Sequence, residues 1–307
     1  MDDSSNPLFI TRGVVLLTQD IATGGWVERA KAAGLTTIAT HVTPGDVTRF
    51  VKTEQGRAFL DACQASGIEV EHELHAMGQL LPRQLFGRDP SMFRMNEQGE
   101  RVADWNLCVH SRQALDVVCE NAVSIAQILR PTTGRYFFWI DDGHPMCRCS
   151  RCRGLSDSEQ ALLLENRVLR ALRESDPRAT LAHLAYANTL KPPAQISPDP
   201  GIFLEFAPIH RSYQVPLSCR EGCASDPKRG SHQELLDALE ANLAVFGCDH
   251  AQVLEYWLDV SLFSGWKRDQ TVRLPWNHDV FLKDLRTYSE FGIRHVTSFA
   301  CWIDGAY

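Results

Sequence analysis

The stretch RYFFWIDDGH, residues 135–144, joins a run of apolar residues to two adjacent acids, Asp141 and Asp142, and a glycine. A short apolar run rich in aromatic residues and bounded by turn-forming residues is typical of a buried strand. The two acids therefore stand at the carboxyl end of a predicted strand, which is where α/β barrels carry their active sites.

Similar runs recur along the whole chain and alternate with helical patterns. Alternation of this kind favours a parallel sheet, and eight strands favour a closed (β/α)8 TIM barrel. We expect residues 1–307 to form one such domain. Because the sequence stops at Tyr307, just after the last predicted strand, we expect a final helix that is lacking or irregular, or a fold that continues beyond these residues. The predicted strands cover 14–18, 36–42, 68–76, 135–141, 180–187, 202–207, 252–259 and 295–303. The predicted helices cover 25–33, 47–66, 111–129, 158–175, 232–246 and 279–291.

One connection, residues 77–110, is too long for a simple loop and contains Pro82 and Pro90. Long connections after barrel strands are often functional. We therefore predict a loop insertion over the active face.

Composition excludes several classes of protein. A hydrophobic content of 44% in 307 residues is enough for a large core, and the net charge of −7 argues against nucleic acid as a partner. No apolar run approaches the ~20 residues that span a bilayer, so we expect no membrane span. The start, MDDSSNPLF, lacks the basic and apolar regions of a secretory signal, which predicts a cytoplasmic protein. The sequence leaves the oligomeric state open.

The carboxyl ends of the predicted strands are unusually polar for a barrel. Aromatic side chains there, together with Trp276, are suited to stacking against sugar rings. The acids and the histidine at these strand ends include Asp141, Asp142, Glu73, His144, Glu255 and Asp259. The predicted substrate-binding residues of the same face are His41, His75, Tyr186, Asn188, Glu205, His210, Tyr256, Trp257, Trp302 and Asp304.

The acidic pair itself suggests proton transfer. Two carboxylates a few ångströms apart do not ionise together easily, so one pKa should rise. That leaves one proton donor and one charged stabiliser, the division of labour in glycoside hydrolysis. A helix N-cap or a salt-bridged pair is the structural alternative.

A cysteine cluster follows the acids directly. Cys147, Cys149 and Cys152 have the spacing C-x-C-x2-C, which suits zinc with a fourth ligand from elsewhere; we prefer Cys108, with His144 as the alternative. Such a structural zinc would clamp the loop after the fourth strand, and four thiolates would leave no open position for catalysis. Free thiols or a disulfide remain the alternative, and no cofactor is expected for catalysis itself.

An ordered set of short motifs resembles a known family from about Asn106 to Tyr288. The family is the large bacterial domain-of-unknown-function family 4838, associated with glycoside hydrolase family 163, the endo-β-N-acetylglucosaminidases. The motifs are Asn106-Leu-Cys108, Asp142 with the cysteines that follow it, Ala185-Tyr186 before Pro192-Pro193, Glu255-Tyr256, and Asp284-Leu-Arg-x-Tyr288.

The resemblance implies a barrel glycosidase that acts on N-acetylhexosamine-containing glycans with retention, using the acetamido oxygen of the substrate as nucleophile. It further implies that Asp141 orients the acetamido group and Asp142 is general acid and then base, or the reverse, with Glu255 as a second candidate acid. Members of the family are usually secreted.

Two other functions are compatible with the residues. His41, Glu73, His75, Asp142, Glu205, His210 and Glu255 include the ligand types of divalent-metal hydrolases and isomerases. A carbohydrate-binding barrel without catalysis is the third possibility.

Overall fold

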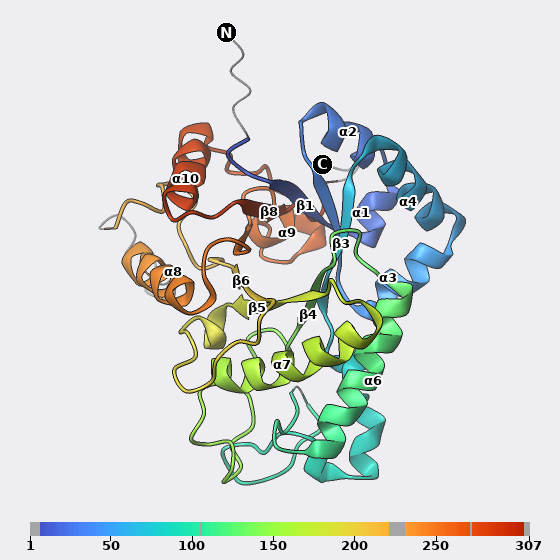
Figure 1. Cartoon of the computed structure of the whole chain (residues 1–307). Helices are drawn as coiled ribbons and strands as arrows, with labels where there is room; N and C mark the ends of the chain where they lie inside the picture. Colours follow the sequence, from blue (N-terminus) through green and yellow to red (C-terminus); the bar gives the residue numbers. More distant parts are fainter. Residues whose placement is uncertain (1–6, 105, 221–230, 271, 304–307) are drawn as a thin grey trace.

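The computed structural model describes residues 7–303 except 105, 221–230 and 271. Its eight strands are all parallel and form a closed barrel in sequence order, with β8 paired to β1 (Figure 1). The predicted TIM barrel is confirmed, although all eight strands end earlier than predicted. The strands are β1 (Thr11–Leu17), β2 (Thr37–His41), β3 (Glu69–His75), β4 (Arg135–Trp139), β5 (Thr180–Ala185), β6 (Ile202–Phe206), β7 (Gln252–Glu255) and β8 (His295–Phe299).

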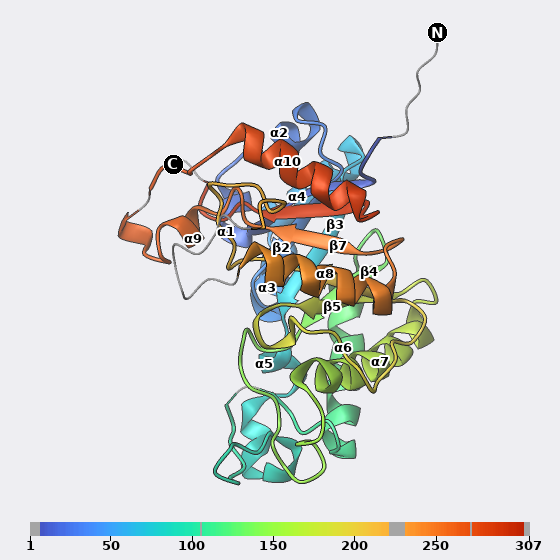
Figure 2. The ribbon, with the colours of Figure 1, turned by 90° about the vertical axis from the view of Figure 1, so that its left-hand side faces the viewer.

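Helices surround the barrel in both views (Figures 1 and 2). The connection from β5 to β6 contains only the short 3-10 helix η3 (Ala187–Thr189), and the described residues after β8, 300–303, contain no helix. The α-helices are α1 (Thr18–Ala22), α2 (Trp26–Ala32), α3 (Pro44–Lys52), α4 (Glu54–Ser66), α5 (Met77–Leu80), α6 (Arg112–Ile128), α7 (Asp157–Ser175), α8 (His232–Phe246), α9 (Val260–Phe263) and α10 (His278–Glu290). The other 3-10 helices are η1 (Arg83–Gly87), η2 (Pro90–Met92) and η4 (Arg268–Gln270).

The single helix predicted over 47–66 is two helices, α3 and α4. Thr53 separates them in an extended conformation and caps α4 by accepting a hydrogen bond from the amide of Gly56. A Cβ at Gly56 would lie 2.0 Å from the carbonyl oxygen of Phe50, so only glycine permits this close turn.

The insertion 77–110 contains α5, η1 and η2. Two antiparallel bridges, Phe93 with Leu107 and Met95 with Arg101, close its second half into a compact loop. It extends to one side of the barrel, beside α6 (Figures 1 and 2). No helix in the described part of the chain is long and apolar enough to cross a membrane.

The interior of the barrel contains a buried polar layer. Gln252 on β7 donates to Glu73 on β3 at 3.1 Å and accepts from Arg135 on β4 at 2.9 Å. Strand β7 pairs with β6 and β8 and with neither β3 nor β4, so these hydrogen bonds cross the interior. Burial raises the pKa of Glu73, and Arg135 only partly opposes this shift.

Candidate active site

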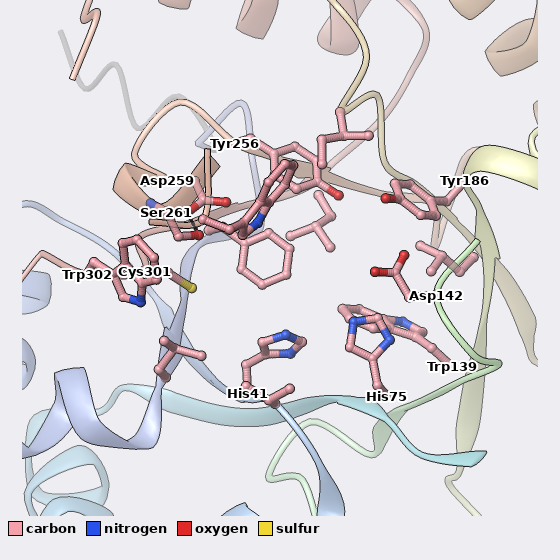
Figure 3. Close-up of a pocket in the computed structure, with 17 residues that line it drawn as sticks. His41, His75, Trp139, Asp142, Tyr186, Tyr256, Asp259, Ser261, Cys301 and Trp302 are labelled. Carbon is pink, nitrogen blue, oxygen red and sulfur yellow. Dashed lines mark hydrogen bonds between the residues drawn. The ribbon is translucent and has the colours of Figure 1, made fainter. Parts of the chain in front are cut away.

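A cavity of about 280 Å³ opens at the carboxyl ends of the strands. This volume is near the lower end of the range for small-molecule sites. Figure 3 shows that side chains from both halves of the barrel converge on it. Its polar and aromatic lining residues are His41, His75, Trp139, Asp142, Tyr186, Tyr256, Asp259, Ser261, Trp266, Phe299, Cys301 and Trp302.

Asp142 lies in the wall of this cavity, directly after β4, and faces the phenol of Tyr186 (Figure 3). Burial, the charge of Asp142 and a hydrogen bond to it raise the pKa of Tyr186. The phenol therefore stays protonated at neutral pH and is available to hydrogen-bond the carboxylate. This arrangement holds a carboxylate at the edge of an aromatic cavity.

Two histidines form the adjacent wall. The ring centroids of His41 and His75 are 5.2 Å apart, and both rings contact Trp139. Burial lowers the pKa of His41 to about 3 and also lowers that of His75, so both rings are neutral at pH 7. His41 Nδ1 lies 2.6 Å from the carbonyl oxygen of Glu73, which can only accept; the proton is therefore on Nδ1, and Nε2 is unprotonated.

Asp141 does not line the cavity, contrary to the expectation that both acids act on substrate. Its Oδ2 accepts a hydrogen bond from Arg83 Nη2 at 2.8 Å, and its amide donates to Asn106 Oδ1 at 3.1 Å. Burial raises the pKa of Asp141 to about 6, although Arg83 opposes the shift. The charge of Asp142 adds to this rise but is a smaller cause than burial.

The insertion contributes no lining residue to the cavity among the described residues. Through Arg83 and Asn106 it contacts Asp141, beside the cavity wall. That it lies over the active face stays a prediction.

Glu255, the second candidate acid, is not among the described residues that line the cavity. Its carboxylate is fully buried and accepts from Arg211 Nη1 at 2.7 Å and from the hydroxyl of Tyr288. Arg211 also pairs with Asp284 at 2.7 Å. Trp257 likewise faces away from the cavity, since its Nε1 donates to Asp284 at 3.1 Å.

Glu205, a predicted substrate-binding residue, is also not among the described residues that line the cavity. It is fully buried beneath the cavity and accepts from Trp139 Nε1 at 2.7 Å. Burial raises its pKa to about 8, so it is mostly protonated at neutral pH. Its role in the structure is to orient the indole that forms part of the cavity wall.

The remaining predicted residues lie around the cavity or outside the described chain. Asn188 donates to the carbonyl of His144 at 3.2 Å and to Asp157 at 2.7 Å, so it braces the loop after β4. The His210 ring stacks on Tyr186 with centroids 6.3 Å apart and lies behind the cavity wall. Asp304 lies outside the described residues. Trp276 is exposed and packs on Phe281 instead of lining the cavity.

The second carboxylate of the cavity is Asp259, which the sequence reasoning did not select for the site. It lies after β7, and its Oδ1 accepts from the amides of Ser261 and Leu262 and from the Ser261 hydroxyl. Burial raises the pKa of Asp259. Its position at a strand end was the available signal, but its spacing to Ser261 is also that of an ordinary helix cap.

Donor groups that suit a metal gather at one place in the described chain. Cys108, Cys147, Cys149 and Cys152 are all buried, and their Sγ atoms lie within 4.8 Å of one another. Cys108, the residue preferred from the sequence as the fourth ligand, is thus part of this cluster. His41, His75 and Asp142 line the cavity, but the histidines and acids that a divalent-metal barrel would require form no such group among the described residues. Glu73, Glu205 and Glu255 are buried and are not among the lining residues.

Solved structures with a similar fold include several enzymes at low sequence identity. Endo-glycoceramidase II from Rhodococcus sp. has a TM-score of 0.54 at 12% identity, covering 95% of this chain and 73% of that one. A GH5-4 broad specificity endoglucanase from an uncultured bacterium has a TM-score of 0.50 at 12% identity, covering 91% and 78%. A beta-galactosidase from the psychrophilic Marinomonas ef1 has a TM-score of 0.51 at 12% identity, covering 95% and 54%. At such identities the similarity establishes the fold alone.

No curated protein matches the sequence. The family described as Domain of unknown function (DUF4838) matches residues 27–234, which is more than half of the chain. The chain therefore belongs to the DUF4838 family.

Proposed function

We propose that this protein is a retaining glycoside hydrolase of N-acetylhexosamine-containing glycans, with Asp142 as the general acid and then the general base. The observation that carries the proposal is the position of Asp142, a carboxylate in the wall of an aromatic cavity at the carboxyl end of a TIM barrel. Catalytic residues of such barrels come from these strand ends.

Two further lines support a carbohydrate substrate. The solved structures of similar fold named above are an endo-glycoceramidase, an endoglucanase and a beta-galactosidase. The aromatic rings of Tyr186, Tyr256, Trp266 and Trp302 give the cavity the flat apolar surfaces that sugar rings stack against. The resemblance to the endo-β-N-acetylglucosaminidases of family 163 supports a substrate whose sugar carries an acetamido group.

In the first step, protonated Asp142 gives its proton to the glycosidic oxygen while the acetamido oxygen of the substrate attacks the anomeric carbon. The bond to the leaving group breaks, and the leaving group departs with the proton. Water then attacks the same carbon and opens the resulting oxazoline ring, while Asp142 takes a proton from the water. Two displacements at one carbon give net retention.

The group that polarises the acetamido must lie in the cavity, so we move this role from Asp141 to Asp259. Asp142 and Asp259 lie on opposite sides of the cavity in Figure 3. A sugar between them would present its glycosidic oxygen to Asp142 and its acetamido group to Asp259. If Asp259 instead attacks carbon directly, the acetamido group becomes dispensable.

The decisive experiment compares two aryl glycosides, 4-nitrophenyl N-acetyl-β-glucosaminide and 4-nitrophenyl β-glucoside, with NMR of the first-formed product. We expect turnover of the first only, with the β-anomer released first. Equal turnover of both would overturn substrate assistance, and release of the α-anomer would overturn retention. Calorimetric binding of a glycan without any turnover would assign a carbohydrate-binding barrel instead. Loss of activity on treatment with a chelator that leaves the fold intact would favour the divalent-metal alternative.

A further inference from the structure

The four clustered cysteines have a geometry that a disulfide does not explain. Cys108 Sγ lies 3.8 Å from Cys149 Sγ and 3.8 Å from Cys152 Sγ. A disulfide requires sulfur atoms about 2.05 Å apart. Four sulfurs at the corners of a tetrahedron around zinc, each about 2.3 Å from the ion, are about 3.8 Å from one another. The observed separations therefore fit a shared central ion.

The surroundings of the cluster suit thiolates. The amide of Met95 donates to Cys147 Sγ at 3.3 Å, and Arg101 Nη1 donates to the same sulfur at 3.7 Å. Four thiolates around a divalent ion carry a net charge of minus two, which a guanidinium and an amide donor offset. Both donors come from the insertion 77–110, and so does Cys108.

We propose that Cys108, Cys147, Cys149 and Cys152 bind one zinc ion that fastens the insertion to the loop after β4. Four protein ligands fill the tetrahedral coordination, so the ion has no open position and takes no part in the chemistry of the cavity. The proposal is independent of the reaction, because it rests on sulfur positions outside the cavity.

The position of Asn106, two residues before Cys108, shows what the ion would hold in place. Asn106 is fully buried; its Nδ2 donates to the carbonyls of His144 and Pro145 at 3.1 and 3.3 Å, and its Oδ1 accepts from the amide of Asp141 at 3.1 Å. The segment that supplies one zinc ligand thus also fixes the backbone on either side of Asp142. Zinc would stabilise this segment and, through it, the direction of the acid.

The test is metal analysis of the purified chain by mass spectrometry, with Cys149→Ser as the variant and Cys248→Ser as the matched control. Cys248 is a free, half-buried thiol outside the cluster. We expect about one equivalent of zinc in the wild type and in Cys248→Ser, and less than about a tenth of an equivalent in Cys149→Ser.

A second measurement covers the case in which Cys149→Ser does not fold. Wild-type protein exchanged with cobalt(II) should show the intense visible absorption of a tetrahedral four-thiolate site, and Cys248→Ser should show it equally. After chelation under mild conditions, proteolysis within 77–110 should accelerate.

Four results would overturn the proposal. They are a wild type without zinc after refolding in its presence, zinc retained by a folded Cys149→Ser variant, and one equivalent of iron in place of zinc. The fourth is a disulfide that includes one of these four cysteines, located by peptide mass spectrometry after denaturation without reductant.

Discussion

Arg83 donates a hydrogen bond to Asp141, with Nη2 and Oδ2 2.8 Å apart, and this contact holds Asp141 outside the cavity that its neighbour Asp142 lines. The chain bends at Asp141 and turns at Asp142 and Gly143, and the amide of His144 donates to the carbonyl oxygen of Asp141 at 3.2 Å. The acidic pair is therefore divided: one carboxylate faces the proposed substrate, and the other attaches the strand end to the insertion.

The first prediction separates these two roles by mutation. Asp142→Asn should lower kcat/KM on an aryl N-acetyl-β-glucosaminide by at least ~100-fold, because a positioned acid or base contributes about 10²–10⁴-fold. Asp141→Asn should cost less than about ten-fold, since its carboxylate does not reach the substrate. Circular dichroism should show that both variants fold. Full activity in folded Asp142→Asn would remove the proposed mechanism.

The second prediction concerns the pH dependence of stability. Burial raises the pKa of Asp141 to about 6 from its usual 3.8, so folded protein holds this proton over a range where unfolded chain releases it. The stability gained from protonated Asp141 is present below pH 3.8 and is lost as pH rises through 6. The free energy of unfolding of the wild type, minus that of Asp141→Asn, should therefore fall across this range in urea titrations. A difference that stays constant with pH would contradict the prediction.

A third prediction tests the assignment of Glu255 to the structural framework. Glu255→Gln removes the charge that pairs with buried Arg211, and breaking a buried ion pair costs about 3–5 kcal/mol. Urea denaturation should show a loss of this order. Glu240→Gln, at an exposed position on α8, should stay within about 0.5 kcal/mol of wild type. Unchanged stability together with lost activity would return Glu255 to the catalytic residues.

The fourth prediction uses two tryptophans with different surroundings. Trp266 is 64% exposed and lines the cavity, whereas Trp276 is 47% exposed and lies outside it. Trp266→Ala should raise KM about 2- to 10-fold, the equivalent of about 0.5–1.5 kcal/mol of aromatic contact, without lowering the melting temperature. Trp276→Ala should leave KM unchanged. Equal effects in the two variants would show that the cavity is not where the sugar stacks.

The barrel could be predicted because its strands are continuous apolar runs, as RYFFW in β4 illustrates. Their ends were harder to predict. The apolar run at 252–259 continues past Glu255, the last residue of β7. The sequence therefore does not distinguish Glu255 from Asp259 as the acid at the strand end. Glu255 is buried and Asp259 lines the cavity. The difference arises from Arg211, which follows β6 and donates a hydrogen bond to Glu255. No sequence pattern predicts this contact.

The direction of Asp141 depends in the same way on a distant residue. Arg83 is 58 residues away in a segment without regular periodicity. By contrast, the sequence predicted Cys108 as the fourth member of the cysteine cluster, because a thiolate is a characteristic zinc ligand. Its grouping with Cys147, Cys149 and Cys152 is confirmed by the sulfur positions, while the metal stays a prediction.

The bonds of Asn106 to the strand-end loop have a consequence for protein engineering. Residues 77–110 and the loop from Ile140 to Ser156 share Asn106, Arg83 and the sulfur cluster as common contacts. A chimera that exchanges only one of the two segments with another family member would pair donors with acceptors that never evolved together. Recombination designs should therefore transplant both segments as one module.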